Sequence, residues 1–391
     1  MTIQFTRSNT GRNLTTVSQS ICFVARHYYK KSIGGAEVQM FLLATQLASS
    51  GWHVTYLTPD IKSAQVDQGV KLYPIRSSLV DATVEKEIST SLSEINPDII
   101  YQRGRSTFTK ACYHYCSKNN IPLVFALSMD IDCRVFRNSL RLKEYGSRNP
   151  VRWLWTALRL GAQDLSSYRA MKSADLICCQ TNYQKRKIEK SSTAHLAVIR
   201  NMHPKHQSKV TKSNPPVILW LASIKKWKQP ELFLELAKQL ADRPYQFVLA
   251  GKMADEHYRQ EIMDMTKQPN FSYIEDVDLE ASNELIEKAS VFVNSSIGNE
   301  GFPNTFIQSW LREVPTVSLL FDPDNLIADE QLGFVSGTVG QLCKDVDLLA
   351  SDERVCQEIG SRARHYAEKT FSTDHVFPKV EALFEIMISG K

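Results

Sequence analysis

Four residues in the last quarter of the chain, Glu300-Gly-Phe-Pro303, combine types that could bind a hydroxyl-bearing anion. They follow a strand-like run and precede a helix predicted over residues 303–313. Pro303 fits the first helical turn, where its missing N–H costs nothing, and the N–H groups from Gly301 to Thr305 then favour an anion. A carboxylate beside them suits hydroxyl groups, as on a sugar, better than phosphate alone. An acidic N-cap before an amphipathic helix is the simpler alternative.

A loop with three lysines supplies the opposite charge. Lys225, Lys226 and Lys228 occur within four positions, between a strand predicted over 217–222 and a helix predicted over 230–242. An ammonium group in such a loop can neutralise a diphosphate. A solvated basic loop would have the same composition.

A third stretch, Gly34-Gly-Ala-Glu37, lies between the first predicted strand and the first predicted helix. Glycine lets the backbone approach a ligand closely, and a helix N-terminus offers unpaired N–H groups to phosphate. The pattern is not the G-x-G-x-x-G fingerprint, so it gives little support to NAD binding. A structural turn is the alternative.

The elements that must position these residues alternate between strand and helix, which is typical of doubly wound parallel sheets. The alternation stops at residues 201–216, which are polar, basic and rich in proline, and then restarts. We predict an N-terminal Rossmann-like domain (1–203), a linker (204–216), a second Rossmann-like domain (217–370) and a final amphipathic helix (371–391). Ligands of such sheets bind at the carboxyl ends of the strands, here in the cleft between the domains.

Composition narrows the class of protein. The 391 residues suit two domains, and 43% hydrophobic with 23% charged residues is ordinary for a globular protein. No apolar run approaches the ~20 residues of a spanning helix, and the polar N-terminus does not resemble a signal peptide. Eight scattered cysteines form no zinc pattern, so we expect reduced thiols in the cytoplasm.

Charge is divided unevenly along the chain. Residues 1–200 hold 27 Lys and Arg against 14 Asp and Glu, whereas residues 201–391 hold 20 against 28. The basic excess is dense from Arg134 to Arg200 and predicts an anionic partner for the first half. A nucleic-acid partner is disfavoured, because the basic half lacks aromatic-interleaved repeats or a recognised module.

Taken together and in order, the three stretches resemble retaining glycosyltransferases of the GT-B fold, specifically family four of the sequence-based classification. The similarity covers nearly the whole chain, and Glu300-Gly-Phe-Pro303 is its most specific part. Supporting segments are Ala174-Asp-Leu-Ile with Gln180-Thr-Asn, Val198-Ile-Arg-Asn201, Val248-Leu-Ala-Gly251 and Pro315-Thr-Val-Ser318. The resemblance implies two Rossmann-like domains facing across a cleft, and a last helix (371–391) that crosses back to the first domain.

The resemblance also implies a role for each matching position. Glu300 would hold donor-sugar hydroxyls, Lys228 would neutralise the donor diphosphate, and Asp130 is the best candidate for a further contact with acceptor or donor. The remaining expected donor-binding residues are Gly34, Gly35, Ser223, Lys225, Gly251, Gly301, Phe302, Asn304, Thr305 and Gln308.

The chain departs from the family pattern at three places. Ser223 stands where the family has an arginine, five residues before the lysine, and Gln308 replaces the second glutamate. Lys225 or Lys226 could substitute for the arginine, and an amide could still bind ribose hydroxyls. The family's histidine after the fourth strand is absent from Ser128 to Asp132, and Asp130 there could equally cap a turn.

The implied reaction is sugar transfer from a nucleotide-diphosphate sugar to a glycan or lipid-linked acceptor, in cell-surface polysaccharide biosynthesis. It would retain configuration, with same-face attack and the leaving phosphate oxygen taking the acceptor proton, and would need no cofactor and no metal. Asp130-Ile-Asp132 matches a metal motif by letter only, since it lies in the acceptor-side domain. Closure of the two domains would expel water.

The segment 134–169 combines arginines with Trp153 and Trp155, an interfacial combination. We expect a cytoplasmic protein whose segment 134–169 docks on the inner face of the cytoplasmic membrane, or else a basic exposed helix over a core. Two other functions stay open. One is a GT-B-fold sugar-nucleotide epimerase, and the other is a catalytically weak glycan-binding or scaffold protein, which Ser223 and Gln308 would explain.

Overall fold

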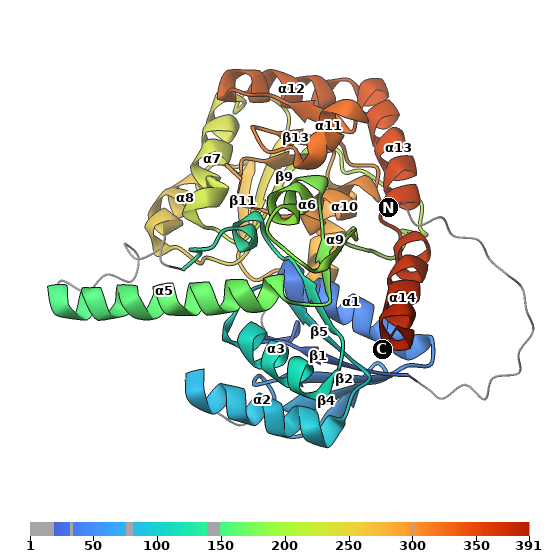
Figure 1. The fold of residues 1–391 in the computed structure, drawn as a ribbon. Helices are drawn as coiled ribbons and strands as arrows, with labels where there is room; N and C mark the ends of the chain where they lie inside the picture. The colour runs from blue at the N-terminus through green and yellow to red at the C-terminus, as the bar shows by residue number, and fades with distance from the viewer. Residues whose placement is uncertain (1–18, 32–33, 76–80, 139–148, 299, 391) are drawn as a thin grey trace, which may run out of the picture.

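The computed structural model describes residues 19–31, 34–75, 81–138, 149–298 and 300–390. These residues form two α/β domains, one above the other in Figure 1, each built around a parallel sheet. In the order of the sheets, the first has eight strands, β3-β4-β2-β1-β5-β6-β7-β8, and the second has six, β11-β10-β9-β12-β13-β14.

The first domain carries its helices on both faces of the sheet. Its strands are β1 Ser20–Val24, β2 His53–Thr58, β3 Gln65–Asp67, β4 Val70–Pro74, β5 Ile99–Arg103, β6 Leu123–Ala126, β7 Leu176–Cys179 and β8 His195–Val198. Its helices are α1 Gly35–Ser49, α2 Asp81–Ile95, α3 Thr107–Asn119, α5 Pro150–Lys172 and α6 Asn182–Glu189, with a 3-10 turn, η1, at Asp130–Cys133.

The second domain repeats the arrangement. Its strands are β9 Val217–Leu221, β10 Gln246–Ala250, β11 Phe271–Ile274, β12 Val291–Asn294, β13 Thr316–Ser318 and β14 Gly333–Val335. Its helices are α7 Pro230–Gln239, α8 Arg259–Met265, α9 Leu279–Lys288, α10 Asn304–Trp310, α11 Leu326–Asp329, α12 Val339–Ser351 and α13 Glu353–Thr370, with 3-10 turns η3 Lys226–Lys228, η4 Glu256–Tyr258 and η5 Pro323–Asn325. The last helix, α14 Thr373–Ser389, returns to the first domain.

Strand β1 shows why both faces of the first sheet must be covered. Ile21 and Phe23 belong to one buried cluster, whereas Cys22 and Val24 belong to another, so successive side chains enter opposite cores. This alternation, with no polar face, is typical of parallel strands between two helical layers.

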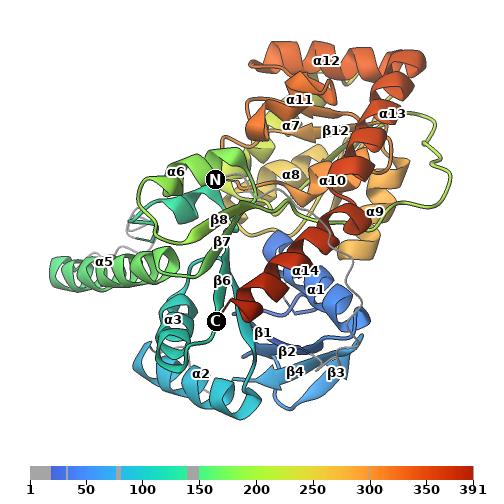
Figure 2. The ribbon, with the colours of Figure 1, turned by 45° about the vertical axis from the view of Figure 1, so that its right-hand side comes forward.

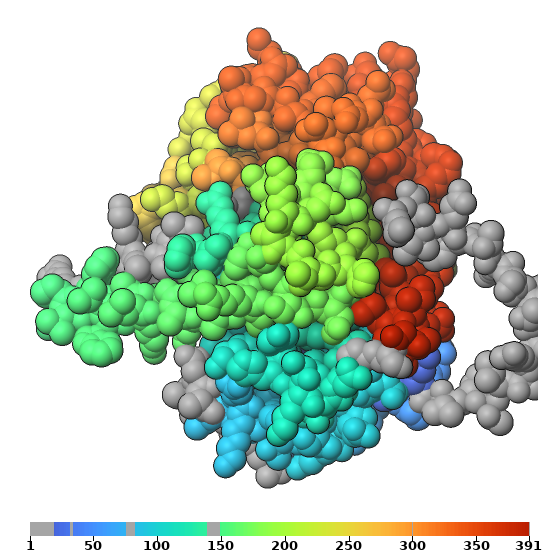
Figure 3. All heavy atoms as spheres, viewed as in Figure 1, coloured from blue at the N-terminus to red at the C-terminus, as the bar shows by residue number. Residues whose placement is uncertain are grey.

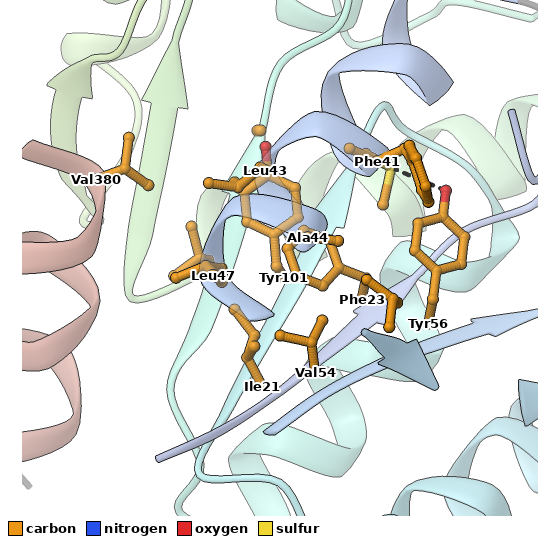
Figure 4. Close-up of a cluster of buried hydrophobic side chains, with 14 of the residues drawn as sticks. Ile21, Phe23, Phe41, Leu43, Ala44, Leu47, Val54, Tyr56, Tyr101 and Val380 are labelled. Atoms are coloured by element: carbon orange, nitrogen blue, oxygen red, sulfur yellow. Dashed lines mark hydrogen bonds between the residues drawn. The ribbon is translucent and has the colours of Figure 1, made fainter. Parts of the chain in front are cut away.

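Helix α14 completes the first of these cores. Figure 4 shows Phe23, Tyr56 and Tyr101 from the strands beneath α1, with Val380 of α14 beside them. Phe384 of α14 is fully buried, its ring centroid 6.0 Å from that of Tyr101. Figure 2 shows the same helix running beside α1. Packing of apolar side chains therefore fixes the end of the chain on the first domain.

The chain crosses between the domains twice, and backbone hydrogen bonds join the two connecting segments. His203 N donates to Phe371 O at 2.9 Å, and Thr373 N donates to His203 O at 2.9 Å. The two connections thus form one short parallel bridge at the side of the cleft. Motion of the domains would bend both connections together.

Two features of the fold were not among the predicted elements. Strands β3 and β4 form an antiparallel hairpin through Gln68 and Gly69, both with positive φ, which matches a two-residue hairpin turn. Strand β14 and helices α11, α12 and α13, which lie between residue 320 and the last helix, were also not predicted. Among the described residues, no helix has the length and apolar character needed to cross a bilayer.

Candidate active site

Lys228 and Glu300 form an ion pair inside the second domain. The Lys228 Nζ contacts Glu300 Oε1, and the two side chains are only 15% and 8% exposed. Lys228 ends the turn after β9 and Glu300 follows β12, and these strands are neighbours in the sheet. Parallel pairing therefore brings together two residues that are 72 positions apart.

A small buried network holds the lysine loop. The Ser295 hydroxyl lies 2.8 Å from Lys228 O and 2.9 Å from Gln229 O, and it accepts a hydrogen bond from the indole N–H of Trp220 at 2.9 Å. The Lys228 ammonium also lies 4.6 Å from the ring centroid of Trp227, within cation–π range. The position of the ammonium is thus fixed from both strands.

The Glu-Gly-Phe-Pro segment faces the first domain. The N–H of Phe302 donates to Gln180 Oε1 at 2.5 Å, and the amide of Gln180 donates to Leu127 O at 2.8 Å. A Cβ added to Gly301 would overlap Gln180 Oε1, so only glycine fits there. The predicted anion-binding N–H of Phe302 is therefore engaged by an oxygen of the first domain.

Asn304 joins the same segment to the glycine turn. Its Nδ2 donates to Gly35 O at 2.9 Å, and its Oδ1 accepts from Asn201 Nδ2 at 2.9 Å. A Cβ on Gly35 would lie 2.9 Å from Asn304 Nδ2. Gly34 lies next to Gly35, and there an added Cβ would overlap the carboxylate of Glu37. The structure thus brings the glycine turn to the start of α10. Helix α10 begins at Asn304, so Pro303 lies before the first helical turn and not in it as predicted.

A second ion pair crosses between the domains. Arg200 lies 2.9 Å from Asp324 Oδ2, and the Asp324 carboxylate also accepts from the N–H groups of Asn182 at 2.8 Å and Tyr183 at 3.1 Å. A residue of the second domain therefore caps α6 of the first. We call Asp324, Arg200 and the first turn of α6 the interdomain latch.

The carboxylates of Asp130 and Asp132 have separate partners. Asp130 Oδ1 accepts from Gln184 Nε2 at 2.9 Å. Burial first, and then the nearby charges of Asp324 and Glu300, raise the pKa of Asp130 to about 6. Asp132 is fully buried and accepts from Ser128 Oγ at 2.8 Å and Arg137 Nη1 at 2.6 Å. Asp132 therefore shapes the turn, and Asp130 faces the carboxylates of the cleft.

Gln308 is not part of this cluster. Its side chain is 4% exposed, and its Nε2 lies 2.9 Å from Asn283 Oδ1 and 3.5 Å from Ser282 Oγ, both on α9. The amide thus joins α10 to α9. Contact with a ribose at this position stays a prediction.

The other predicted donor residues lie around the ends of β9 and β10. Gly251 has φ +134°, and a Cβ there would overlap Ala222 O, so packing against the lysine loop requires glycine. Ser223 is half-buried beside it and Lys225 is exposed. Thr305, in the first turn of α10, is half-buried. Their contacts with a ligand stay predictions.

Four residues that join the domains were not predicted to have a role: Gln180, Arg200, Asn201 and Asp324. A signal existed for the first three, because they follow β7 and β8 at their carboxyl ends, where parallel sheets bind ligands. Asp324 also lies beyond the carboxyl end of a strand, β13, but farther from it than the other three are from theirs. It lies in the loop after β13 with φ +54°, in a turn that no apolar periodicity marks.

Two parallel-sheet domains that face each other in this way define the GT-B fold, and the predicted fold class is confirmed. Sucrose-phosphate synthase from Thermosynechococcus elongatus is similar with a TM-score of 0.74 at 12% identity, over 95% of this chain and 100% of that one. HepE of Anabaena in complex with UDP-glucose has a TM-score of 0.68 at 14% identity, over 94% and 99%. WaaG, a glycosyltransferase involved in lipopolysaccharide biosynthesis, has 0.67 at 14% identity, over 95% and 100%.

The second domain can be identified more closely. Residues 215–352 match the family model "Glycosyl transferases group 1". The matched range holds Lys228 and Glu300 and also Asp324. The comparison with curated proteins gave no match.

Proposed function

We propose that this protein is a retaining glycosyltransferase that moves a sugar from a nucleotide-diphosphate sugar to a glycan or lipid-linked acceptor. The contact between Lys228 and Glu300 in the group 1 domain carries the proposal. A sugar diphosphate would satisfy both groups at once, the diphosphate binding the ammonium and the sugar hydroxyls binding the carboxylate. A donor must therefore separate the pair as it binds.

The proposed chemistry needs few protein groups. The acceptor hydroxyl attacks the anomeric carbon on the face from which the diphosphate leaves, and the leaving phosphate oxygen takes the hydroxyl proton. Lys228 offsets the charge that develops on the diphosphate, so a metal ion is not required. The sugar passes through an oxocarbenium-like state that Glu300 orients through its hydroxyl groups.

The contacts between the domains support a cycle of opening and closure. Phe302 N–H and Asn304 are bonded to Gln180 and Gly35 of the first domain, and Glu300 is only 7% exposed. Entry of a donor requires these contacts to open. Closure afterwards excludes water, which protects the donor from hydrolysis.

The remaining donor contacts are proposed on the same basis. Gly301, Thr305 and Gly251 line the ends of β10 and β12, and Gln308 would reach the ribose only if its bond to Asn283 were exchanged. Since HepE, a similar structure, was solved with UDP-glucose, we expect a uridine-diphosphate sugar to be the first donor to test. WaaG, which acts in lipopolysaccharide biosynthesis, supports a role in making cell-surface polysaccharide.

A membrane contact is proposed for the acceptor side. Helix α5 projects from the body in Figure 1, and Trp153 and Trp155 on it are 42% and 70% exposed, beside Arg152 and Arg159. Exposed tryptophan with arginine suits the interface of an anionic membrane. This would hold a cytoplasmic protein at the inner face of the membrane. Arg141, Lys143 and Arg148 of the same segment lie outside the described residues.

A thermal-shift panel of UDP-, GDP- and ADP-sugars tests the donor site, because a ligand of the folded state raises the melting temperature. We expect a shift with one nucleotide in the natural protein and none in Lys228→Ala. Nucleotide release that requires an acceptor supports transfer. Release without acceptor would indicate the epimerase, and binding without release would indicate a scaffold. If no nucleotide sugar shifts the protein in phosphate-free buffer, the proposal is wrong.

Flotation with vesicles tests the membrane contact separately. Arg152→Glu with Arg159→Glu should reduce binding to anionic vesicles, and the same charge reversal at Arg243 and Arg354 in the second domain should not. Equal flotation of both variants would contradict the proposed contact.

A further inference from the structure

A pocket lies apart from the candidate active site, where α5 ends and the chain turns into β7. It has a volume of about 330 Å³ and is lined by α5 and by the turn between α6 and β8. The side chains that matter are Leu165, Tyr168, Arg169, Lys172, Ser191 and Thr193. Its volume lies within the range of small-ligand sites.

The position of this pocket separates it from the donor site. Ser173 precedes β7 and Thr193 precedes β8, so the pocket lies at the amino ends of these strands. Gln180 and Arg200 follow the carboxyl ends of the same strands and face the second domain. The two sites are therefore at opposite edges of one sheet.

The wall of the pocket is held from several sides. The Tyr168 ring lies 5.1 Å from the guanidinium carbon of Arg105 and 5.5 Å from the ammonium of Lys172. Its hydroxyl lies 3.4 Å from Ser191 Oγ. Arg105 is itself buried and donates to Asp164 O at 2.8 Å. Tyr168 is thus a fixed aromatic wall between the helix and the turn.

The charge of the pocket favours an anion. Arg169 and Lys172 carry two positive charges, and among the described residues neither has an ion-pair partner and no acid lines the pocket. The hydroxyl of Thr193 adds a donor opposite them, whereas that of Ser191 donates to Ile188 O at 3.2 Å. Basic residues in the last turn also offset the helix dipole. That role does not account for the hydroxyls on a separate turn or for the concave shape.

An apolar surface leads into the pocket along α5. Val151, Leu158 and Leu165 are 64%, 60% and 36% exposed, and their spacing by seven places them on one face of the helix. Arg169 is four residues beyond Leu165, so it ends the same face. The apolar part extends for about 21 Å at 1.5 Å per residue. Figure 3 shows α5 standing out from the body over this length.

We propose that this pocket binds a phosphoryl group that is attached to an apolar chain. Arg169 and Lys172 would bind the phosphate oxygens, since arginine and lysine form charge-assisted hydrogen bonds to phosphate. Leu165 and the face of α5 behind it would cover the apolar part. The ligand is either the headgroup of an anionic lipid or a soluble phosphate ester, and both share this chemistry.

Calorimetric titration with hexyl phosphate tests the pocket in full-length protein. The measurement is made in Lys228→Ala, so that the donor site does not contribute. Arg169→Gln with Lys172→Gln should weaken binding by about tenfold or more, because two charge-assisted bonds are lost. Arg152→Gln with Arg159→Gln is the matched control, since it removes two charges from the same helix outside the pocket, and it should leave the affinity within about twofold.

Vesicle flotation identifies the source of the ligand. Phosphatidylcholine vesicles with and without phosphatidic acid are compared for the pocket variant and for Arg243→Gln with Arg354→Gln, which is the control here because Arg152 and Arg159 belong to the proposed membrane contact. Pocket-dependent binding of hexyl phosphate alone supports a soluble ester, and pocket-dependent flotation with phosphatidic acid supports a lipid headgroup. Equal binding by the pocket variant and the control, or binding of neither probe, would overturn the proposal. Leu165→Asn should weaken hexyl phosphate and leave inorganic phosphate unaffected, which distinguishes the apolar contact from the ionic one.

Discussion

Two ion pairs lie near the cleft, and they differ in what holds them together. Lys228 and Glu300 come from neighbouring strands of one sheet, so their contact does not depend on how the domains are placed. Arg200 and Asp324 come from different domains, so their contact exists only when the domains meet. In the proposed function, the first pair would bind the donor and the second would form when the domains close.

This difference separates two ways of losing activity. Removing a member of the first pair should take away a group that acts on the donor, whatever the domains do. Removing Asp324 should leave the donor groups in place and change the population of closed molecules. Comparison of the two pairs thus distinguishes chemistry from closure.

The largest expected effect is that of Glu300→Ala. Loss of a group that acts in the transition state typically lowers kcat by about 10²–10³-fold, and we expect a loss of at least that size in sugar-transfer assays. Lys228→Ala should be equally severe, because the diphosphate would lose its counter-charge. Melting temperatures serve as the control, since each change leaves a nearly buried partner charge unpaired. Turnover above a tenth of normal in either folded variant would contradict the assignment.

The sequence indicated the first pair but not the second, and physical reasons explain both results. The strands before Lys228 and Glu300 are short apolar runs with marked ends, so their loops could be placed at the edge of a parallel sheet. Asp324 becomes important only through contact with a helix of the other domain, and no local pattern encodes that contact. Gln308 illustrates the same limit. Its spacing from Glu300 was evident, but its bond to Asn283 depends on how α9 packs on α10.

The second largest effect should follow Asp324→Ala. It removes the partner of Arg200 and the cap of α6. The free energy of closure should therefore become less favourable by about 1–2 kcal/mol, which lowers the equilibrium constant for closure roughly tenfold. We expect a similar loss of kcat, with nucleotide binding unchanged by calorimetry. Asp329→Ala, an exposed acid in the same region, is the control. Loss of nucleotide binding in Asp324→Ala would show that the latch belongs to the donor site.

Burial raises the pKa of Asp130 to about 6, and the nearby charges of Asp324 and Glu300, one from each pair, add to this rise. An acid with a raised pKa stabilises the fold when protonated, and this contribution is lost as the pH rises from near 3.8 to about 6. Asp130→Asn should therefore gain melting temperature relative to the natural protein between pH 4 and pH 7. A difference that stays constant with pH would show that Asp130 is not coupled to the cleft, and Glu189→Gln, at an exposed acid of α6, is the control.

The smallest effect is expected for Gln308→Ala, and it sharpens the comparison within α10. Glu300 lies at the ion pair, whereas Gln308 is bonded to Asn283 on α9, so its loss should change donor affinity more than turnover. A single neutral hydrogen bond is worth about 1 kcal/mol, which corresponds to a rise in donor KM of about fivefold. Asn283→Ala should behave alike if the amide acts through α9. At saturating donor, a loss of kcat equal to that of Glu300→Ala would mean that Gln308 acts in the transition state as well.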